Sequence, residues 1–88
     1  MSFMGRTSKR DKSQYRIDSL SKSILVLEAV EGGEPVPFRR IVERTGFSED
    51  FVRRSLITWE LHNYVRMTGN NCWIYDRRLL SFALSAGL

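Results

Sequence analysis

The segment from Ile41 to Val65, IVERTGFSEDFVRRSLITWELHNYV, constrains the fold of this 88-residue chain more than any other. Its apolar residues recur at helical spacing on both sides of Gly46, a residue free to adopt the positive φ that a tight turn needs. Ser48 is a good N-cap, and Glu49 and Asp50 follow it where the helix dipole favours negative charge. The pattern predicts a short helix, a turn and a longer helix, which together form a helix-turn-helix.

An earlier helix is predicted from Ser19 to Val30, with Asp18 or Ser19 as its cap and Gly32-Gly33 after its end. Its expected core face consists of Leu20, Ile24, Leu27 and Val30. Leu25 falls off this face and is expected to be exposed.

The rest of the chain predicts a wing and a last helix. The Pro-rich residues 34–37 favour an extended link or edge strand, and a helix should run from Phe38 to Thr45. Residues 64–67 and 72–75 predict two strands joined by the turn Thr68-Gly69-Asn70-Asn71, and residues 76–86 a final helix. Alternation along the strands predicts Val65 and Met67 on one face, and Trp73 and Tyr75 on another. The expected fold is mainly α with a small β-hairpin: a winged helix-turn-helix with a three-helix core, a two-stranded wing and a C-terminal helix.

Residues 1–18 have little apolar content and are predicted to form a flexible arm before a domain at residues 19–88. The arm holds five basic residues against two acidic ones and accounts for most of the net charge of +4. These cations are candidates for DNA contact; the alternative is a solvated tail. They are Arg6, Lys9, Arg10, Lys12 and Arg16.

Three segments in order carry a resemblance to a known family: SLSKSILVLEAV from Ser19, the run from Phe38 to Val65, and WIYDRRLL from Trp73. From Ser19 onward the chain resembles the DNA-binding domain of IclR-family transcription regulators. The resemblance implies a sequence-specific regulator that places the second helix of its helix-turn-helix in the major groove of double-stranded DNA.

The chain also departs from the family pattern. Members usually have Ser or Thr followed by Glu at the start of the middle helix, where this chain has Arg39-Arg40; these cations suggest a phosphate partner. Glu49 and Asp50 stand where neutral or basic residues are more common, and Asp50 would need a partner such as a cytosine amino group. The family's ligand-binding domain is expected to be missing after Leu88, which suits a small autonomous regulator of the kind that phages and mobile elements encode.

The candidate DNA-binding residues lie on three parts of the predicted domain. Arg53 and Arg54 are expected to meet base edges or phosphate, unless they form a salt-bridged helix face with Glu49 or Asp50. The two Asn residues at the wing tip are equally consistent with a good turn alone. The full set is Arg39, Arg40, Ser48, Asp50, Arg53, Arg54, Arg66, Asn70 and Asn71.

Other functions have little support in the sequence. Cys72 and His62, one of each, cannot make a structural zinc site, and no phosphate-binding Gly loop or paired-carboxylate site is present. We therefore expect no enzymatic activity, no metal and no cofactor. No apolar run approaches the roughly 20 residues of a membrane span, and a cytoplasmic, nucleoid-associated protein is expected.

The expected partners are DNA and a second copy of the chain, because a single module this small binds DNA weakly. Leu25 and the last helix are the expected dimer surface. Ile57 and Leu61 lie opposite the core face of their helix. They either pack under the wing or against the first helix, or form an apolar contact surface together with Leu25 or the last helix. The alternative is a winged-helix protein-interaction module, an anti-repressor or adaptor, that uses these apolar residues and does not bind DNA.

Overall fold

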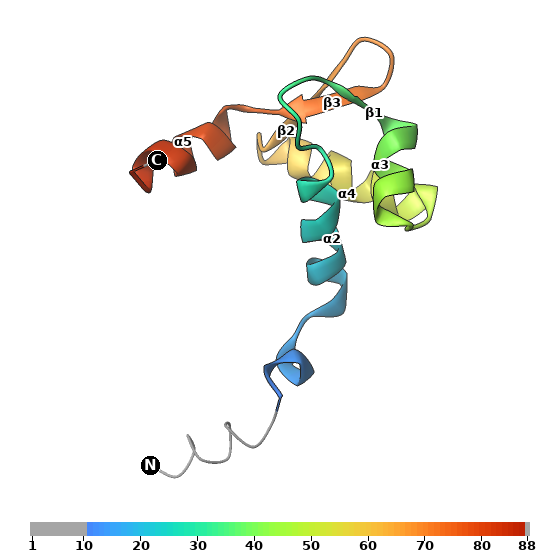
Figure 1. Ribbon diagram of the computed structural model, residues 1–88, viewed down its shortest axis with the longest axis vertical. Coiled ribbons are helices and arrows are strands. Elements are labelled where there is room, and N and C mark those ends of the chain that lie inside the picture. Colours follow the sequence, from blue (N-terminus) through green and yellow to red (C-terminus); the bar gives the residue numbers. More distant parts are fainter. Residues whose placement is uncertain (1–10, 88) are drawn as a thin grey trace.

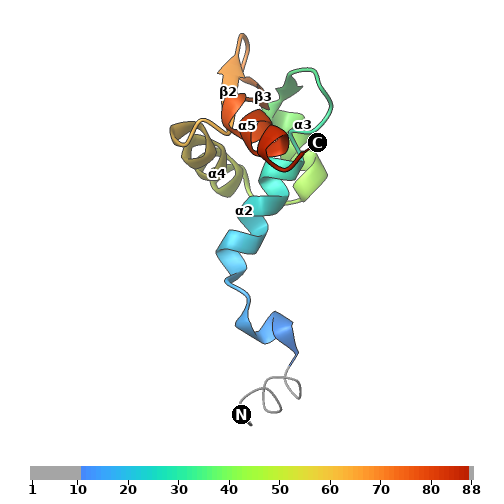
Figure 2. The same cartoon turned by 90° about the vertical axis from the view of Figure 1, so that its left-hand side faces the viewer.

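Three helices and a small antiparallel sheet enclose the core in the arrangement of a winged helix-turn-helix (Figure 1). The computed structural model describes residues 11–87. Its elements are η1 (Lys12–Tyr15), α2 (Asp18–Glu28), β1 (Val36–Pro37), α3 (Phe38–Thr45), α4 (Glu49–Leu61), β2 (Val65–Thr68), β3 (Cys72–Tyr75) and α5 (Arg77–Ser85). The mainly helical fold with a wing is the predicted one. η1 lies beyond the N-terminal end of α2, inside the predicted arm and away from the other helices (Figures 1 and 2).

The helix-turn-helix forms with the predicted chemistry. α3 spans the predicted residues and ends at Gly46, which has a φ of 74° and donates its N–H to the Val42 carbonyl over 2.8 Å. Two residues later the Ser48 hydroxyl accepts a hydrogen bond from the Phe51 N–H at 3.2 Å and caps α4. Asn63, with a φ of 65°, follows the C-terminal end of α4.

The predicted core face of α2 was right at Leu27 and Val30 and wrong at Leu20 and Ile24. Val26 and Val30 are buried, whereas Leu20 and Ile24 are 49% and 41% exposed. The helix packs on α4 along a line that includes Ser23, whose carbonyl accepts a hydrogen bond from Trp59 Nε1 at 3.0 Å. Ser23 therefore lies on the side of α2 that faces α4, where the apolar periodicity predicted Leu20 and Ile24. Only the C-terminal half of α2 reaches the core.

The predicted cap of α2 was also wrong. The N-cap is Ile17, whose side chain makes no capping hydrogen bond. Asp18 lies in the first turn, where it meets the helix dipole and forms an ion pair with Lys22 at 3.3 Å.

The sheet has three strands, because β1 pairs with β3 on the side away from β2. β2 begins one residue later than predicted, and Thr68 pairs with Cys72 across the loop of residues 69–71. The pairing register is thus shifted by one residue from that of the predicted turn of residues 68–71, and the two expected faces become one. Val65 stands opposite Tyr75 and Met67 opposite Trp73, so the side chains predicted for two faces share one.

The C-terminal end of α2 is closed by side chains from two other elements. The Tyr75 hydroxyl, on β3, donates to the Leu27 carbonyl at 2.9 Å. Arg44, on α3, donates through Nη1 to the carbonyls of Ala29 at 2.6 Å and Glu31 at 3.3 Å. Carbonyls at a helix end lack regular intrahelical donors, so these bonds supply donors there, in addition to the Val30 N–H that reaches the Leu27 carbonyl at 3.2 Å, and tie α3 and β3 to α2.

Tyr75→Phe should lower the free energy of unfolding by about 1 kcal/mol at neutral pH, because it removes the hydroxyl's hydrogen bond and leaves the Leu27 carbonyl with the Val30 N–H alone. The substitution keeps the ring and its packing. Urea unfolding followed by tryptophan fluorescence measures the change.

The same substitution should alter stability at alkaline pH. Burial, together with the charges of Glu31 and Glu28, raises the pKa of Tyr75 above 10.0, and Arg44 partly offsets this effect. A raised pKa in the folded state means that the neutral phenol stabilises the fold below pH 10 and that this contribution is lost as pH rises further. The wild-type chain should therefore lose more stability between pH 9 and 11 than Tyr75→Phe. Parallel pH profiles for the two proteins would contradict the assignment.

Candidate nucleic-acid interface

α4 has one buried and one exposed face. Val52, Ser55 and Leu56 are buried in the core. The opposite side, called the outer face here, consists of the exposed residues Asp50, Arg53, Arg54 and Ile57. The structure thus places three predicted DNA-binding residues on one solvent-facing surface.

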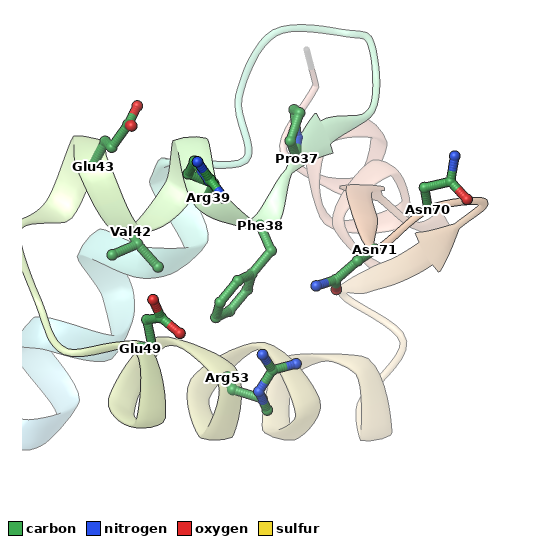
Figure 3. Close-up of a pocket in the computed structure, with 9 residues that line it drawn as sticks. All are labelled: Pro37, Phe38, Arg39, Val42, Glu43, Glu49, Arg53, Asn70 and Asn71. Atoms are coloured by element: carbon green, nitrogen blue, oxygen red, sulfur yellow. The ribbon is translucent and has the colours of Figure 1, made fainter.

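Arg53 is held against the core by an aromatic ring. Its guanidinium carbon lies 4.3 Å from the ring centre of Phe38, a residue that is 8% exposed (Figure 3). The Phe38 N–H in turn donates to the Asn71 carbonyl at 3.0 Å. A stacked guanidinium uses its flat face and keeps the N–H groups at its edge for other acceptors, so Arg53 is oriented and still able to donate.

Arg53 forms one wall of a groove between α3, α4 and the wing tip, with a volume of about 340 Å³ (Figure 3). Its cations, Arg39 and Arg53, are accompanied by the carboxylates of Glu43 and Glu49. The groove is lined by Pro37, Phe38, Arg39, Val42, Glu43, Glu49, Arg53, Asn70 and Asn71. It therefore brings together predicted site residues from all three parts of the domain, with a balanced charge.

Arg54 and Arg40 each form a long ion pair on their own helix. Arg54 Nη1 lies 3.7 Å from Asp50 Oδ2, and Arg40 Nε lies 4.0 Å from Glu43 Oε1. All four side chains are exposed, and such pairs contribute only about 0.3–0.5 kcal/mol. These pairs are weak enough to exchange for a phosphate or a base edge.

Asn71 has a structural role at the wing tip. It adopts a φ of 58° and its side-chain oxygen accepts a hydrogen bond from Trp73 Nε1 at 3.2 Å. Asn70 is exposed at the turn itself. Of the two wing asparagines, Asn70 is the one whose side chain is presented to solvent.

Arg66 lies apart from this groove. Its Cα partner in the sheet is Ile74, and it lines a separate cavity of about 480 Å³ with Arg77 and Leu80 of α5. The structure therefore does not place Arg66 beside Arg53 and the wing tip.

The described part of the arm contributes two cations. Lys12 lies in η1, and Arg16 follows it with its Nη2 3.9 Å from Asp18 Oδ1. The other predicted arm contacts, Arg6, Lys9 and Arg10, lie outside the described residues.

The contact between Phe38 and Arg53 was not predicted from the sequence. The two residues lie on different helices, and no spacing within either helix indicates their contact. Arg44 was missed as well, because its carbonyl partners belong to the end of a helix whose position depends on the fold.

Several apolar side chains remain exposed, as Leu25 was predicted to be. Leu25 is 49% exposed, Ile57 44% and Leu61 76%. α5 has no buried residue, although Phe82 contacts the Tyr64 ring at 5.7 Å between ring centres. These residues are part of the apolar surface that residues 11–87 expose, which also includes Leu20, Ile24 and Met67.

Residues 11–87 were also compared with the requirements of a metal site and of a membrane span. No group of three or more His, Cys, Asp or Glu side chains in this range is arranged to hold a metal ion. No helix within the same residues has the length and apolar character needed to cross a membrane.

The fold is shared with solved structures of two bacterial proteins. HmgR from Pseudomonas aeruginosa superposes with a TM-score of 0.71 at 21% identity, over 80% of this chain. An IclR family transcriptional regulator from Brucella abortus superposes with a TM-score of 0.73 at 18% identity, over 88% of this chain. The match spans about 30% of each of those chains, and at these identities it shows the fold alone. No family model and no curated protein matches the sequence.

Asn71→Ala should destabilise the chain by about 1–3 kcal/mol, because it strains a left-handed backbone position and leaves Trp73 Nε1 without an acceptor. Asn71→Gly should recover part of that loss, since glycine adopts the same φ without strain. Asn70→Ala is the matched control and should change stability by less than about 0.5 kcal/mol. Chemical denaturation of the three variants tests this, and equal effects at positions 70 and 71 would contradict it.

Proposed function

We propose that this chain is a sequence-specific double-stranded DNA-binding transcription regulator that inserts α4 into the major groove. The observation that carries the proposal is the outer face of α4, where Asp50, Arg53 and Arg54 are exposed together on a winged helix. An α-helix fits the major groove, and base edges there are read by Arg, which binds guanine, and by Asp, which accepts from cytosine.

The remaining cations have supporting roles in this proposal. Arg39 and Arg40, exposed in the first turn of α3, would contact backbone phosphates on one side of the groove. Asn70, Arg66 and the basic arm would reach flanking phosphate or the minor groove. Ser48 and Asn71 would act through backbone groups, because their side chains are engaged in hydrogen bonds within the chain.

We further propose that the chain binds as a homodimer on a two-fold-related site. The surface best suited to a second copy is the exposed apolar part of α5, Leu80, Phe82 and Leu84, together with Leu25 of α2. A dimer doubles the phosphate and base contacts, which a module of this size needs for specific affinity. A regulator of this kind would act in the cytoplasm on the nucleoid.

Charge reversal at both outer-face arginines, Arg53→Glu with Arg54→Glu, should weaken binding to a selected duplex at least 100-fold and leave the fold intact. Each good Arg–guanine contact is worth about 1–3 kcal/mol, and the new carboxylates add repulsion. The duplex is first selected from a random library, and affinity is measured by fluorescence anisotropy, with circular dichroism as the check on folding.

The matched control is Lys22→Glu with Arg77→Glu, which makes the same change of net charge at two residues that are not assigned to the proposed DNA or dimer surfaces. Both residues are exposed. The control should retain affinity within about tenfold at moderate salt. Equal losses from the two double variants would mean that net charge, and no particular face, governs binding.

A second candidate function is that of an interaction module that binds another protein, and two observations favour it. Glu49 and Asp50 begin α4 with two exposed carboxylates, and Leu61 is the most exposed large apolar side chain among residues 11–87. Such a module would show no affinity for random duplex DNA even at low salt. The DNA-binding proposal instead expects affinity that falls steeply with salt, because cations bound to phosphates release counterions. A salt titration with random duplex distinguishes the two functions.

A further inference from the structure

We propose that Ile57 is a specificity-determining residue that reads the 5-methyl group of a thymine in the major groove. This inference rests on the proposed function and assigns a base to a side chain that the function did not otherwise use. Ile57 lies in the middle of α4, is 44% exposed and belongs to no part of the core cluster. The exposed part of this apolar side chain is available to a partner outside the chain.

The position of Ile57 on the helix supports the assignment. Asp50, Arg53, Arg54 and Ile57 follow the spacing i, i+3, i+4 and i+7, which places four side chains on one strip of a helix. A recognition helix that lies along the major groove presents base-reading residues at this same spacing. Ile57 therefore occupies the fourth reading position, after three residues whose chemistry suits base edges.

The neighbours of Ile57 favour nucleic acid over an apolar protein surface. Arg53 and Arg54 stand one turn before it on the same strip of the helix. Glu60, three residues further on, lies in the last turn of the helix. The strip carries two arginines against the single carboxylate of Asp50, which matches a polyanionic partner, and these cations would be costly to bury against an apolar protein surface.

The chemistry of the side chain then selects the base. Isoleucine cannot donate to a phosphate or to the acceptors of guanine and adenine. Thymine is the base that presents an apolar group, its C5 methyl, on its major-groove edge. Leu61, one turn further and 76% exposed, is close to the end of the helix and serves as the matched control.

The test compares thymine with deoxyuridine, which lacks only the methyl group, at each thymine of the selected duplex in turn. Binding of the full chain is measured by fluorescence anisotropy. One thymine per half-site should be sensitive, with about fourfold weaker binding on replacement, as expected for losing one buried methyl group. Ile57→Ala should weaken binding to the thymine duplex and bind the two duplexes equally. Leu61→Ala should keep the wild-type preference for thymine.

The outcomes separate this inference from the function on which it rests. Selective binding to a duplex without any thymine-sensitive position, or an Ile57→Ala variant that keeps the preference, overturns the role of Ile57 and leaves the regulator intact. Absence of binding to any duplex at low salt overturns both. Unchanged affinity of Ile57→Ala, with thermal unfolding like the wild type, would instead assign the residue to a protein partner and overturn the reading of thymine.

Discussion

The packing of α4 is the constraint on which the rest of the molecule depends. This helix buries Val52, Ser55 and Leu56 against α2 and the sheet, and in doing so it turns its other side outward. A helix that is apolar on one face has no freedom to rotate once that face is buried. The orientation of every outer-face side chain is therefore decided by residues that never meet a ligand.

Much of the architecture was predictable because local signals and tertiary packing agree in the middle of the chain. Gly46, Ser48 and Asn63 each act through their own backbone, so their effects can be inferred from neighbouring residues alone. The face of α2 could not be inferred in this way. Its apolar residues surround much of the helix, and the choice of Val26 over Leu20 and Ile24 depends on which segment of α2 the α4 helix crosses.

The candidate site was less predictable than the fold. That Arg53 and Arg54 share one helix face follows from their spacing, but the ring beneath Arg53 comes from α3 and the groove beside it from the wing. A single-residue difference in register placed the apolar side chains of the two wing strands on one face instead of two, because a hairpin's pairing depends on which loop residues adopt positive φ. Contacts between distant segments and one-residue changes of strand register cannot be predicted from the periodicity of apolar residues.

Phe38 has a further consequence through its position between α4 and the wing. Its ring supports Arg53, and its N–H bonds to the loop that ends at β3. The freedom of the arginine side chain is thus restricted before any partner arrives. Much of the conformational entropy that a flexible arginine would lose on binding is therefore lost during folding. In the proposed complex, ordering this side chain would add less to the free-energy cost of binding.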